Sequence, residues 1–218
     1  MKTIIFDLDG TILDTLQDLT NAVNHGLKSY NLAEMGIDFI RKAIGNGTQV
    51  LIRRCIFDNL TENEIQAVFN SFKSYYLEHY DDYTKPYPGI KELLTELKGK
   101  CKIAVVSNKD DDLVNKLINK EFPGLFDIIQ GSYFDKPKKP DPYLINKITK
   151  ENNLNKEECL YIGDTNIDKE SADNAGLQHR LVSYGYRNKD ELKKICPNDI
   201  PFETVEELRN YLLKWVNL

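Results

Sequence analysis

The fold of this chain is decided near its start, by the stretch Ile4-Ile5-Phe6-Asp7-Leu8-Asp9-Gly10-Thr11. Residues 2–6 form a short apolar run with β-branched side chains, which is the pattern of a strand covered on both faces. The run stops abruptly at two acids, Asp7 and Asp9, followed by a glycine and a threonine. In an open parallel sheet, ligands bind at the carboxyl ends of the strands. The stretch therefore predicts a buried strand that carries two acids to the edge of a site.

Two carboxylates this close repel each other unless a cation or a shared proton offsets the charge. Asp7 and Asp9 therefore indicate either a site for a hard divalent cation or an acid/base pair. Gly10 would make a turn after them inexpensive. The alternative is an ordinary turn or helix N-cap, since aspartate and glycine are common turn formers. The succession of strand, acid pair and turn favours the functional interpretation.

Length and composition set the outer limits of the interpretation. A chain of 218 residues can form one core, or a core domain with a smaller insert. Its formal net charge of −5 argues against nucleic acid as the main partner. No apolar run approaches membrane-spanning length and an acid interrupts the first one, so we expect a cytoplasmic protein with no membrane partner. The four widely spaced cysteines do not suggest a zinc site or a disulfide framework.

Residues 14–83 have helical periodicity throughout, with helices expected at 14–30, 38–44, 48–56 and 61–83. Thr61 and Glu64 form a capping-box sequence at the start of the last of these. The helical region ends at Lys85-Pro86-Tyr87-Pro88-Gly89, because two prolines and a glycine cannot continue a helix. We predict a helical domain at 14–83, inserted into a core domain formed by residues 1–13 and 84–218.

Strands and helices alternate outside the insert. Buried strands are expected at residues 101–107 and 159–163, a short strand at 127–130 and a last strand at 180–183. Helices are expected at residues 90–98, 111–119, 142–152, 169–175 and 204–216. This alternation predicts the α/β class: a Rossmann-like parallel sheet with helices on both faces and right-handed crossovers, plus a small α-helical domain inserted after the first strand.

Polar side chains follow several of these strands. Ser107 and Asn108 end one strand, and Asp164, with Asp168 four residues later, ends another. Because the carboxyl ends of parallel strands share one edge of the sheet, we expect these groups to converge with the acids after the first strand. Each has a plainer interpretation, since Asp164 or Thr165 would cap the next helix and Ser107-Asn108 would form a strand-to-helix turn.

These motifs together resemble those of the haloacid dehalogenase superfamily of phosphohydrolases. Residues 7–11 match its first motif, Asp-x-Asp-Gly-Thr, and residues 163–168 match its acidic fourth motif, Gly-Asp-[Ser/Thr]-x-x-Asp. Residues 107–108 resemble its second motif, and residues 139–142 fit the Lys-Pro-x-Pro pattern of the third. Three further segments look like those of the phosphoglycolate phosphatase-like branch: Tyr87-Pro88-Gly89, Asn174-Ala175-Gly176 and Tyr184-Gly185-Tyr186-Arg187.

The resemblance implies a Mg²⁺-dependent phosphatase that acts on a small phosphomonoester through an aspartyl phosphate, with the helical insert as a cap domain. Asp7 would be the nucleophile, Asp9 the general acid and base, and Lys139 the cation that offsets charge at the nucleophile and the phosphoryl oxygens. The implied metal ligands are the Asp7 carboxylate, the Asp9 backbone carbonyl and Asp164. The implied phosphate-binding residues are Ser107, Asn108 and Lys139. Asp168, Gly10 and Thr11 would support the site.

Several alternatives stay open at this point. Lys136 and Lys138 lie close enough in sequence to replace Lys139. A phosphosugar mutase on the same fold would return the phosphoryl group to a sugar instead of water. A phospho-receiver domain also uses an acceptor aspartate on a parallel sheet, but it lacks a large helical insert. The identity of the phosphomonoester, and whether the protein is a monomer or a homodimer, are not indicated by the sequence.

Overall fold

The computed structural model describes residues 1–217, which divide into two compact units. The first unit contains Met1–Leu13 and the chain from Pro86 onward. The second is the segment Asp14–Lys85 between them. Its end therefore lies two residues beyond position 83, where the sequence placed the end of the insert.

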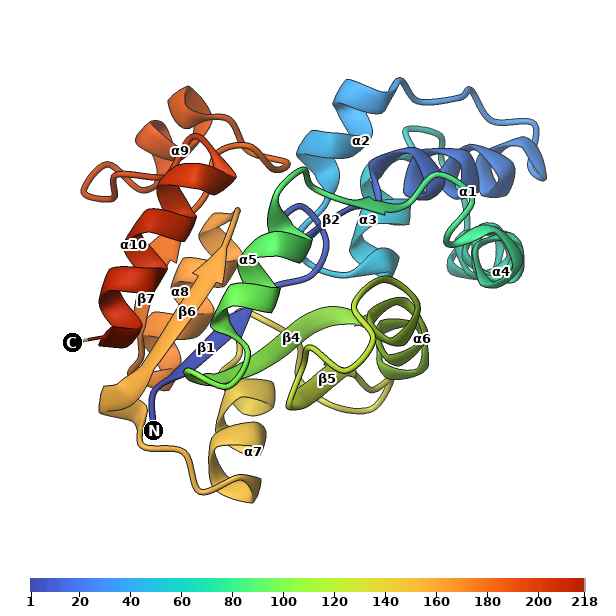
Figure 1. The fold of residues 1–218 in the computed structure, drawn as a ribbon. Helices are drawn as coiled ribbons and strands as arrows, with labels where there is room; N and C mark the ends of the chain where they lie inside the picture. Colours follow the sequence, from blue (N-terminus) through green and yellow to red (C-terminus); the bar gives the residue numbers. More distant parts are fainter. Residues whose placement is uncertain (218) are drawn as a thin grey trace. The chain divides into compact units, whose positions relative to one another are not determined.

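The first unit is built on a parallel sheet of strands in the order β5-β4-β1-β6-β7 (Figure 1). The strands are β1 (Thr3–Phe6), β4 (Lys102–Asp110), β5 (Ile128–Ser132), β6 (Cys159–Gly163) and β7 (Gln178–Leu181). Strand β1 lies at the centre and all four of its residues are buried. The predicted α/β class with a parallel sheet is confirmed, and the first acidic stretch leaves the sheet from its middle strand.

Helices cover both faces of this sheet. They are α5 (Ile90–Leu97), α6 (Asp111–Glu121), α7 (Tyr143–Glu151), α8 (Asn166–Ala175), α9 (Lys189–Ile195) and α10 (Val205–Asn217). On one face, side chains of α7 and α8 share a buried apolar cluster with β1, β4 and β6. On the other face, α5 and α10 run in front of the sheet in Figure 1, and Arg209 of α10 binds Glu96 of α5 through two hydrogen bonds.

The second unit consists of α1 (Leu16–Lys28), α2 (Ile37–Ala43), α3 (Thr48–Arg54) and α4 (Glu62–His79). Helices α1 and α4 pack closely, since a Cβ atom at Gly26 would lie 2.9 Å from the Val68 carbonyl oxygen. The capping box of Thr61 and Glu64 is present at the start of α4, as predicted. Asp18 of α1 is buried and accepts hydrogen bonds from the Tyr83 and Thr84 backbone amides. This carboxylate therefore ties the first helix of the unit to its last residues.

Some element boundaries differ from the predictions. Two short strands, β2 (Leu13–Asp14) and β3 (Lys85–Pro86), pair with each other where no strand was expected. Helix α9 was also missed, although its first turn carries a capping box between Asn188 and Glu191 that the sequence displays. The last strand ends at Leu181, where it pairs with Gly163, instead of continuing to residue 183.

The most consequential difference concerns β4. The sequence predicts that this strand stops at Ser107, but it continues to Asp110, which pairs with Ser132 of β5 after a shift in register. Pairing with a strand more than twenty residues away is not visible in the local sequence. Asn108, Lys109 and Asp110, which follow the predicted end at residue 107, therefore belong to the strand.

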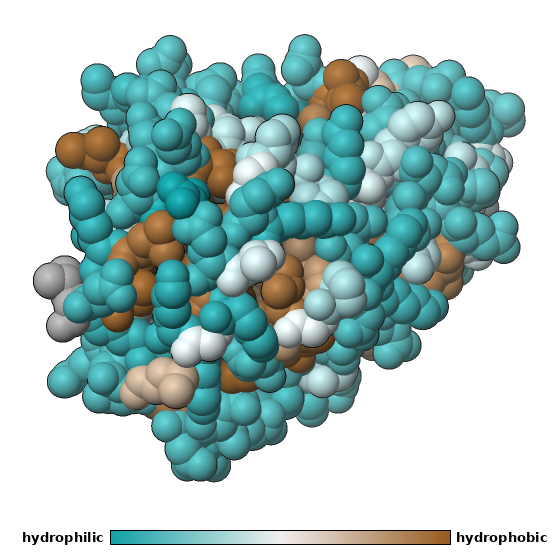
Figure 2. All heavy atoms as spheres, viewed as in Figure 1, coloured by the Kyte–Doolittle hydropathy of each residue, from teal (hydrophilic) through white to brown (hydrophobic). Residues whose placement is uncertain are grey.

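The surface seen in Figure 2 is largely hydrophilic, with apolar residues in small separate groups. Within residues 1–217, no helix combines the length and the apolar character needed to span a membrane.

Candidate active site

Asp7 lies directly beyond β1, at the carboxyl edge of the sheet. Its backbone amide donates to the Ile162 carbonyl at 2.8 Å, which extends the pairing of β1 with β6 by one residue. Its side chain is buried, and its Oδ1 accepts a hydrogen bond from Lys139 Nζ at 2.6 Å. Asp7 is therefore held at both its backbone and its carboxylate.

The chain turns immediately after Asp7. The amides of Ile12 and Leu13 both donate to the Leu8 carbonyl, and Gly10 adopts a left-handed conformation with φ of 86°. A Cβ atom at Gly10 would lie 2.4 Å from Asp164 Oδ2, so both the backbone angle and the available space require glycine here. The turn thus brings its backbone against an acid from another strand.

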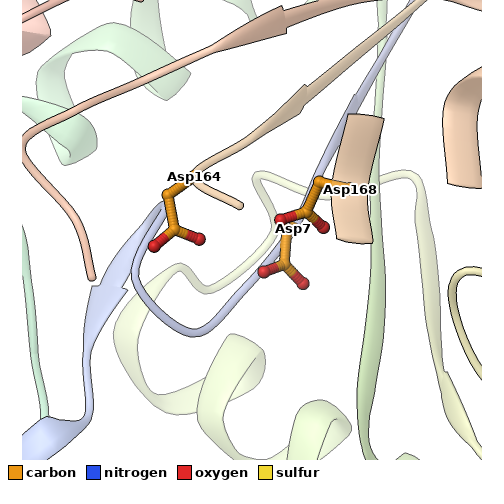
Figure 3. A group of neighbouring side chains, drawn as sticks. All are labelled: Asp7, Asp164 and Asp168. Atoms are coloured by element: carbon orange, nitrogen blue, oxygen red, sulfur yellow. The ribbon is translucent and has the colours of Figure 1, made fainter. Parts of the chain in front are cut away.

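Three carboxylates meet at this edge (Figure 3). Asp7 follows β1, Asp164 follows β6, and Asp168 lies in the first turn of α8, with one oxygen of each within 4.8 Å of the others. All three side chains are buried. Asp168 also completes the capping box of α8 with Thr165, so a residue that caps this helix also lies in the acidic cluster.

Asp164 is held by several elements of the first unit. Its Oδ2 accepts from the Tyr186 backbone amide at 2.7 Å, and its Oδ1 accepts from Thr11 Oγ1 at 3.4 Å. Thr11 thus binds Asp164, and the Gly10 backbone packs against it, without either residue adding a charged group.

Three buried carboxylates lie together here, Lys139 binds two of them, and the positive charge of Arg187 also lowers the pKa of Asp164. Burial raises the pKa of Asp7 to about 7, even though the Lys139 ammonium lowers it. Burial and the neighbouring charges of Asp168 and Asp7 raise the pKa of Asp164 well above its usual range. Three buried carboxylates facing one buried ammonium therefore fit a divalent cation, which favours oxygen ligands and would restore the charge balance. Asp7 and Asp164 are the carboxylates suited to hold it, since Asp168 binds Lys139 and Thr165.

The lysine that reaches the cluster is Lys139. Its Nζ donates to Asp7 Oδ1 at 2.6 Å, to Asp168 Oδ1 at 2.8 Å and to the Tyr161 hydroxyl at 2.9 Å. Burial alone would lower its pKa, but Asp168 and Asp7 outweigh that effect and hold the pKa well above its usual value. Lys136 is exposed and pairs with Asp135. Of the sequence candidates, the structure brings Lys139 to the acids.

A sequence model of the haloacid dehalogenase-like hydrolases matches residues 4–182, a span that includes every residue of this cluster. The chain belongs to this family.

Several proteins similar to this chain are phosphoglycolate phosphatases. A phosphoglycolate phosphatase of Aquifex aeolicus is 37% identical over 188 residues, covering 85% of this chain and 86% of the relative. Phosphoglycolate phosphatase 1 of Pseudomonas aeruginosa is 31% identical, and the match covers 97% of this chain and 78% of the relative. The predicted haloacid dehalogenase resemblance, in its phosphoglycolate phosphatase-like branch, is confirmed, and the protein is a phosphoric monoester hydrolase.

Solved structures show the same fold over nearly the whole chain. The crystal structure of a protein from Lactobacillus delbrueckii subsp. bulgaricus, titled a putative phosphoglycolate phosphatase, superimposes on this chain with a TM-score of 0.88. The two sequences are 31% identical, and the match covers 97% of this chain and 99% of the other. A predicted phosphoglycolate phosphatase from Haemophilus somnus gives a TM-score of 0.86 at 29% identity, with coverages of 97% and 98%.

Within this family architecture, Ser107 and Asn108 lie on the extended part of β4. Ser107 is buried, and its Oγ accepts from the Lys109 backbone amide. Asn108 binds the backbone of Lys139 twice, since its Nδ2 donates to the Lys139 carbonyl at 3.0 Å and its Oδ1 accepts from the Lys139 amide at 2.7 Å. The Asn108 side chain therefore holds the Lys139 backbone, and the phosphate binding expected of Asn108 stays a prediction.

Two features of this haloacid dehalogenase-like site were not predicted. The first is a buried ion pair: Lys109 donates from Nζ to Asp9 Oδ1 at 2.8 Å, and its side chain is only 4% exposed.

The second is the packing of residues 184–185 on the acidic turn. A Cβ atom at Gly185 would lie 1.9 Å from the Gly10 carbonyl oxygen, and the Tyr184 hydroxyl donates to the Thr11 carbonyl. The segment around Gly185 was noted in the sequence only as a family likeness, and its packing on the acidic turn has no local signal.

Proposed function

We propose that this protein hydrolyses a small phosphomonoester, of the phosphoglycolate type, with Mg²⁺ as cofactor and with Asp7 as the group that accepts the phosphoryl moiety. The observation that carries the proposal is the position of Asp7. It follows the central strand, its carboxylate is held by the buried Lys139 ammonium, and two further buried carboxylates lie beside it.

In this reaction an Asp7 oxygen attacks phosphorus while the bond from phosphorus to the leaving oxygen breaks. Lys139 offsets negative charge on Asp7 and on the incoming phosphoryl oxygens, because its ammonium is held at 2.6 Å from the nucleophile. Asp9 donates a proton to the leaving oxygen and later accepts one from the water that hydrolyses the acyl phosphate. Ser107, in the neighbouring strand β4, supplies a hydroxyl to the phosphoryl group.

The residues suited to hold the cation are Asp7 and Asp164, together with the Asp9 backbone carbonyl that the family motif implies. A bound divalent cation would offset the repulsion between the nucleophile and the phosphoryl oxygens. Asp168 supports the site by orienting Lys139 and by capping α8.

The substrate class rests on the relatives named phosphoglycolate phosphatase, several of which are at least 30% identical to this chain. A small phosphorylated metabolite is the corresponding partner. We expect the helical unit, as the cap domain, to contribute to the choice among such metabolites.

The first test is hydrolysis of p-nitrophenyl phosphate with Mg²⁺, with a chelator, and by an Asp7→Asn variant. The proposal expects turnover with Mg²⁺ that is lost with the chelator and in the variant. A screen of phosphoglycolate, sugar phosphates and nucleotides would then rank substrates by kcat/KM. Phosphoglycolate ranking far below the others would overturn the substrate assignment, and a requirement for a sugar bisphosphate with no release of inorganic phosphate would indicate a mutase.

A further inference from the structure

The ion pair formed by Lys109 and Asp9 removes two charged side chains from most of their contact with water. The Lys109 side chain is 4% exposed and that of Asp9 is 16% exposed. Removing two such charges from water is costly, and apolar side chains of similar volume often replace a buried ion pair without loss of stability. A buried ion pair is thus weak evidence for stability, and the position of this pair beside the acidic turn suggests a role in the reaction.

The register of the sheet explains how the pair forms. Phe6, the last residue of β1, pairs with Val105, and β4 continues beyond that pair to Asp110. The extended part of β4 runs past the carboxyl end of β1 and brings Lys109 beside the turn that holds Asp9. The hydrogen bond between them spans 100 positions of sequence.

The chemistry of the two groups determines what the contact does. An ammonium has three donors and no acceptor, so the oxygen that faces it is held as an acceptor. In this structure that oxygen is Asp9 Oδ1. A proton that Asp9 transfers therefore belongs on Oδ2.

We propose that Lys109 is a positioning residue for proton transfer: it holds Asp9 Oδ1, fixes the rotation of the carboxyl group, and assigns Oδ2 as the oxygen that protonates the leaving group. This rests on the proposed function, in which Asp9 is the general acid. As the bond from phosphorus to the leaving oxygen breaks and the bond from Asp7 forms, the leaving oxygen keeps the electron pair and takes the proton from Oδ2. The Asp9 carboxylate that results then faces the Lys109 ammonium.

The test compares two leaving groups. The p-nitrophenolate ion is stable without a proton, whereas an alkoxide is not, so only the alkyl ester needs the acid. We would measure kcat/KM, which covers the steps up to leaving-group departure, for p-nitrophenyl phosphate and for an alkyl phosphate that the wild-type protein accepts, with phosphoglycolate tried first. The variants are Lys109→Met, Lys109→Arg and Asp9→Asn, with Lys116→Met on the exposed face of α6 as the matched control.

Lys109→Met should lower kcat/KM for the alkyl ester by about 10²-fold and that for the aryl ester by less than about tenfold, given what general acids contribute. Lys109→Arg, which keeps a donor, should recover most of the loss, and Lys116→Met should change neither value. The double variant Asp9→Asn/Lys109→Met should be no slower on the alkyl ester than Asp9→Asn alone.

Equal losses on both esters would overturn the inference, because a lysine that binds the phosphoryl group or only stabilises the fold would not discriminate between leaving groups. Additive losses in the double variant would overturn it as well. If Asp9→Asn itself shows no preference, the general-acid role of Asp9 fails, and the inference fails with it. If Asp9→Asn discriminates and Lys109→Met does not, only the inference is wrong. Thermal unfolding of each variant shows whether it is folded, and Lys109→Arg keeps the test informative if Lys109→Met is not.

Discussion

Both units of this protein bury carboxylates, but they do so in different ways. Asp18, in the helical unit, is buried and accepts hydrogen bonds from the Tyr83 amide, the Thr84 amide and the Thr84 hydroxyl. Asp7 and Asp164, at the carboxyl edge of the sheet, are also buried, and burial raises their pKa values. Neutral donors satisfy the first acid, whereas the others lie in a cluster with an excess of negative charge.

This comparison shows that burial alone does not mark a functional acid. A carboxylate that receives several short hydrogen bonds from nearby backbone has a structural task, the joining of two chain segments. Carboxylates that are buried together, with too few donors to offset their charge, need a bound proton or a further positive partner, and such arrangements occur at functional sites. The predictions below test whether the two kinds of acid differ as this comparison requires.

The largest expected effect is that of Asp7→Asn. An amide is a poor nucleophile, so kcat should fall by about 10⁴-fold or more, in the range seen when a catalytic nucleophile is removed. The free energy of unfolding should not fall, because the substitution removes one of several neighbouring negative charges. Steady-state kinetics and urea unfolding of the same preparation would measure both. A variant that lost stability as well as activity would show that Asp7 resembles Asp18 and that the comparison is wrong.

The second effect is the pH dependence of stability in the absence of divalent cations. The pKa of Asp7 is raised from 3.8 to about 7 in the folded protein, so the native state binds more protons than the unfolded state between these values. The free energy of unfolding should therefore decrease as pH rises from about 4 to about 7, by on the order of a few kcal/mol. Added Mg²⁺ should reduce this decrease, since it would bind the ionised form. Urea unfolding across this range with a chelator and with Mg²⁺ measures it, and a chelated protein that gains stability with rising pH would contradict the prediction.

The sequence was sufficient to predict those residues of the candidate site that directly follow a strand. The run before Asp7 predicted the central strand, and the acids after two strands were predicted to meet at one edge, which is where the structure places Asp7, Asp164 and Asp168. Strand ends in a parallel sheet share an edge whatever the order of the strands, so this inference needed no knowledge of register.

The residues that were missed depend on register and on loops from distant segments. Lys109 looked like a lysine beyond the end of its strand, because the pairing that extends β4 comes from β5. The contact of Asn108 with the Lys139 backbone joins residues 31 positions apart, and Gly185 packs on a turn near the start of the chain. Such contacts leave no periodic pattern in the sequence, so only the folded structure displays them.

The third prediction concerns the structural acid. Asp18→Asn replaces one acceptor oxygen by an amino group facing the amides of Tyr83 and Thr84, which leaves buried donors without an acceptor. The protein should lose about 1–3 kcal/mol of stability, the usual cost of unsatisfied buried groups. The kcat of the folded molecules should change little. Asp38→Asn is the control, since the Asp38 side chain is 90% exposed and should tolerate the change without a shift in Tm. A large loss of kcat in Asp18→Asn without a loss of stability would remove the distinction between the two acids.

The last prediction compares the addition of one methyl group at a glycine in each unit. A Cβ atom at Gly185 would meet the Gly10 carbonyl at 1.9 Å and Asp164 Oδ2 at 2.7 Å, so Gly185→Ala must displace the acidic turn or its own segment. Overpacking of this kind costs about 1–3 kcal/mol. Gly36→Ala, in the helical unit, adds a methyl group where no other atom lies within 4 Å and where φ is −68°, so it should leave stability almost unchanged. Because the displaced turn carries Asp7 and Asp9, Gly185→Ala should also lower kcat by a larger factor than Gly36→Ala does. Equal kcat values would mean that the turn tolerates movement without loss of function, and the tight packing around Asp164 would then matter for stability alone.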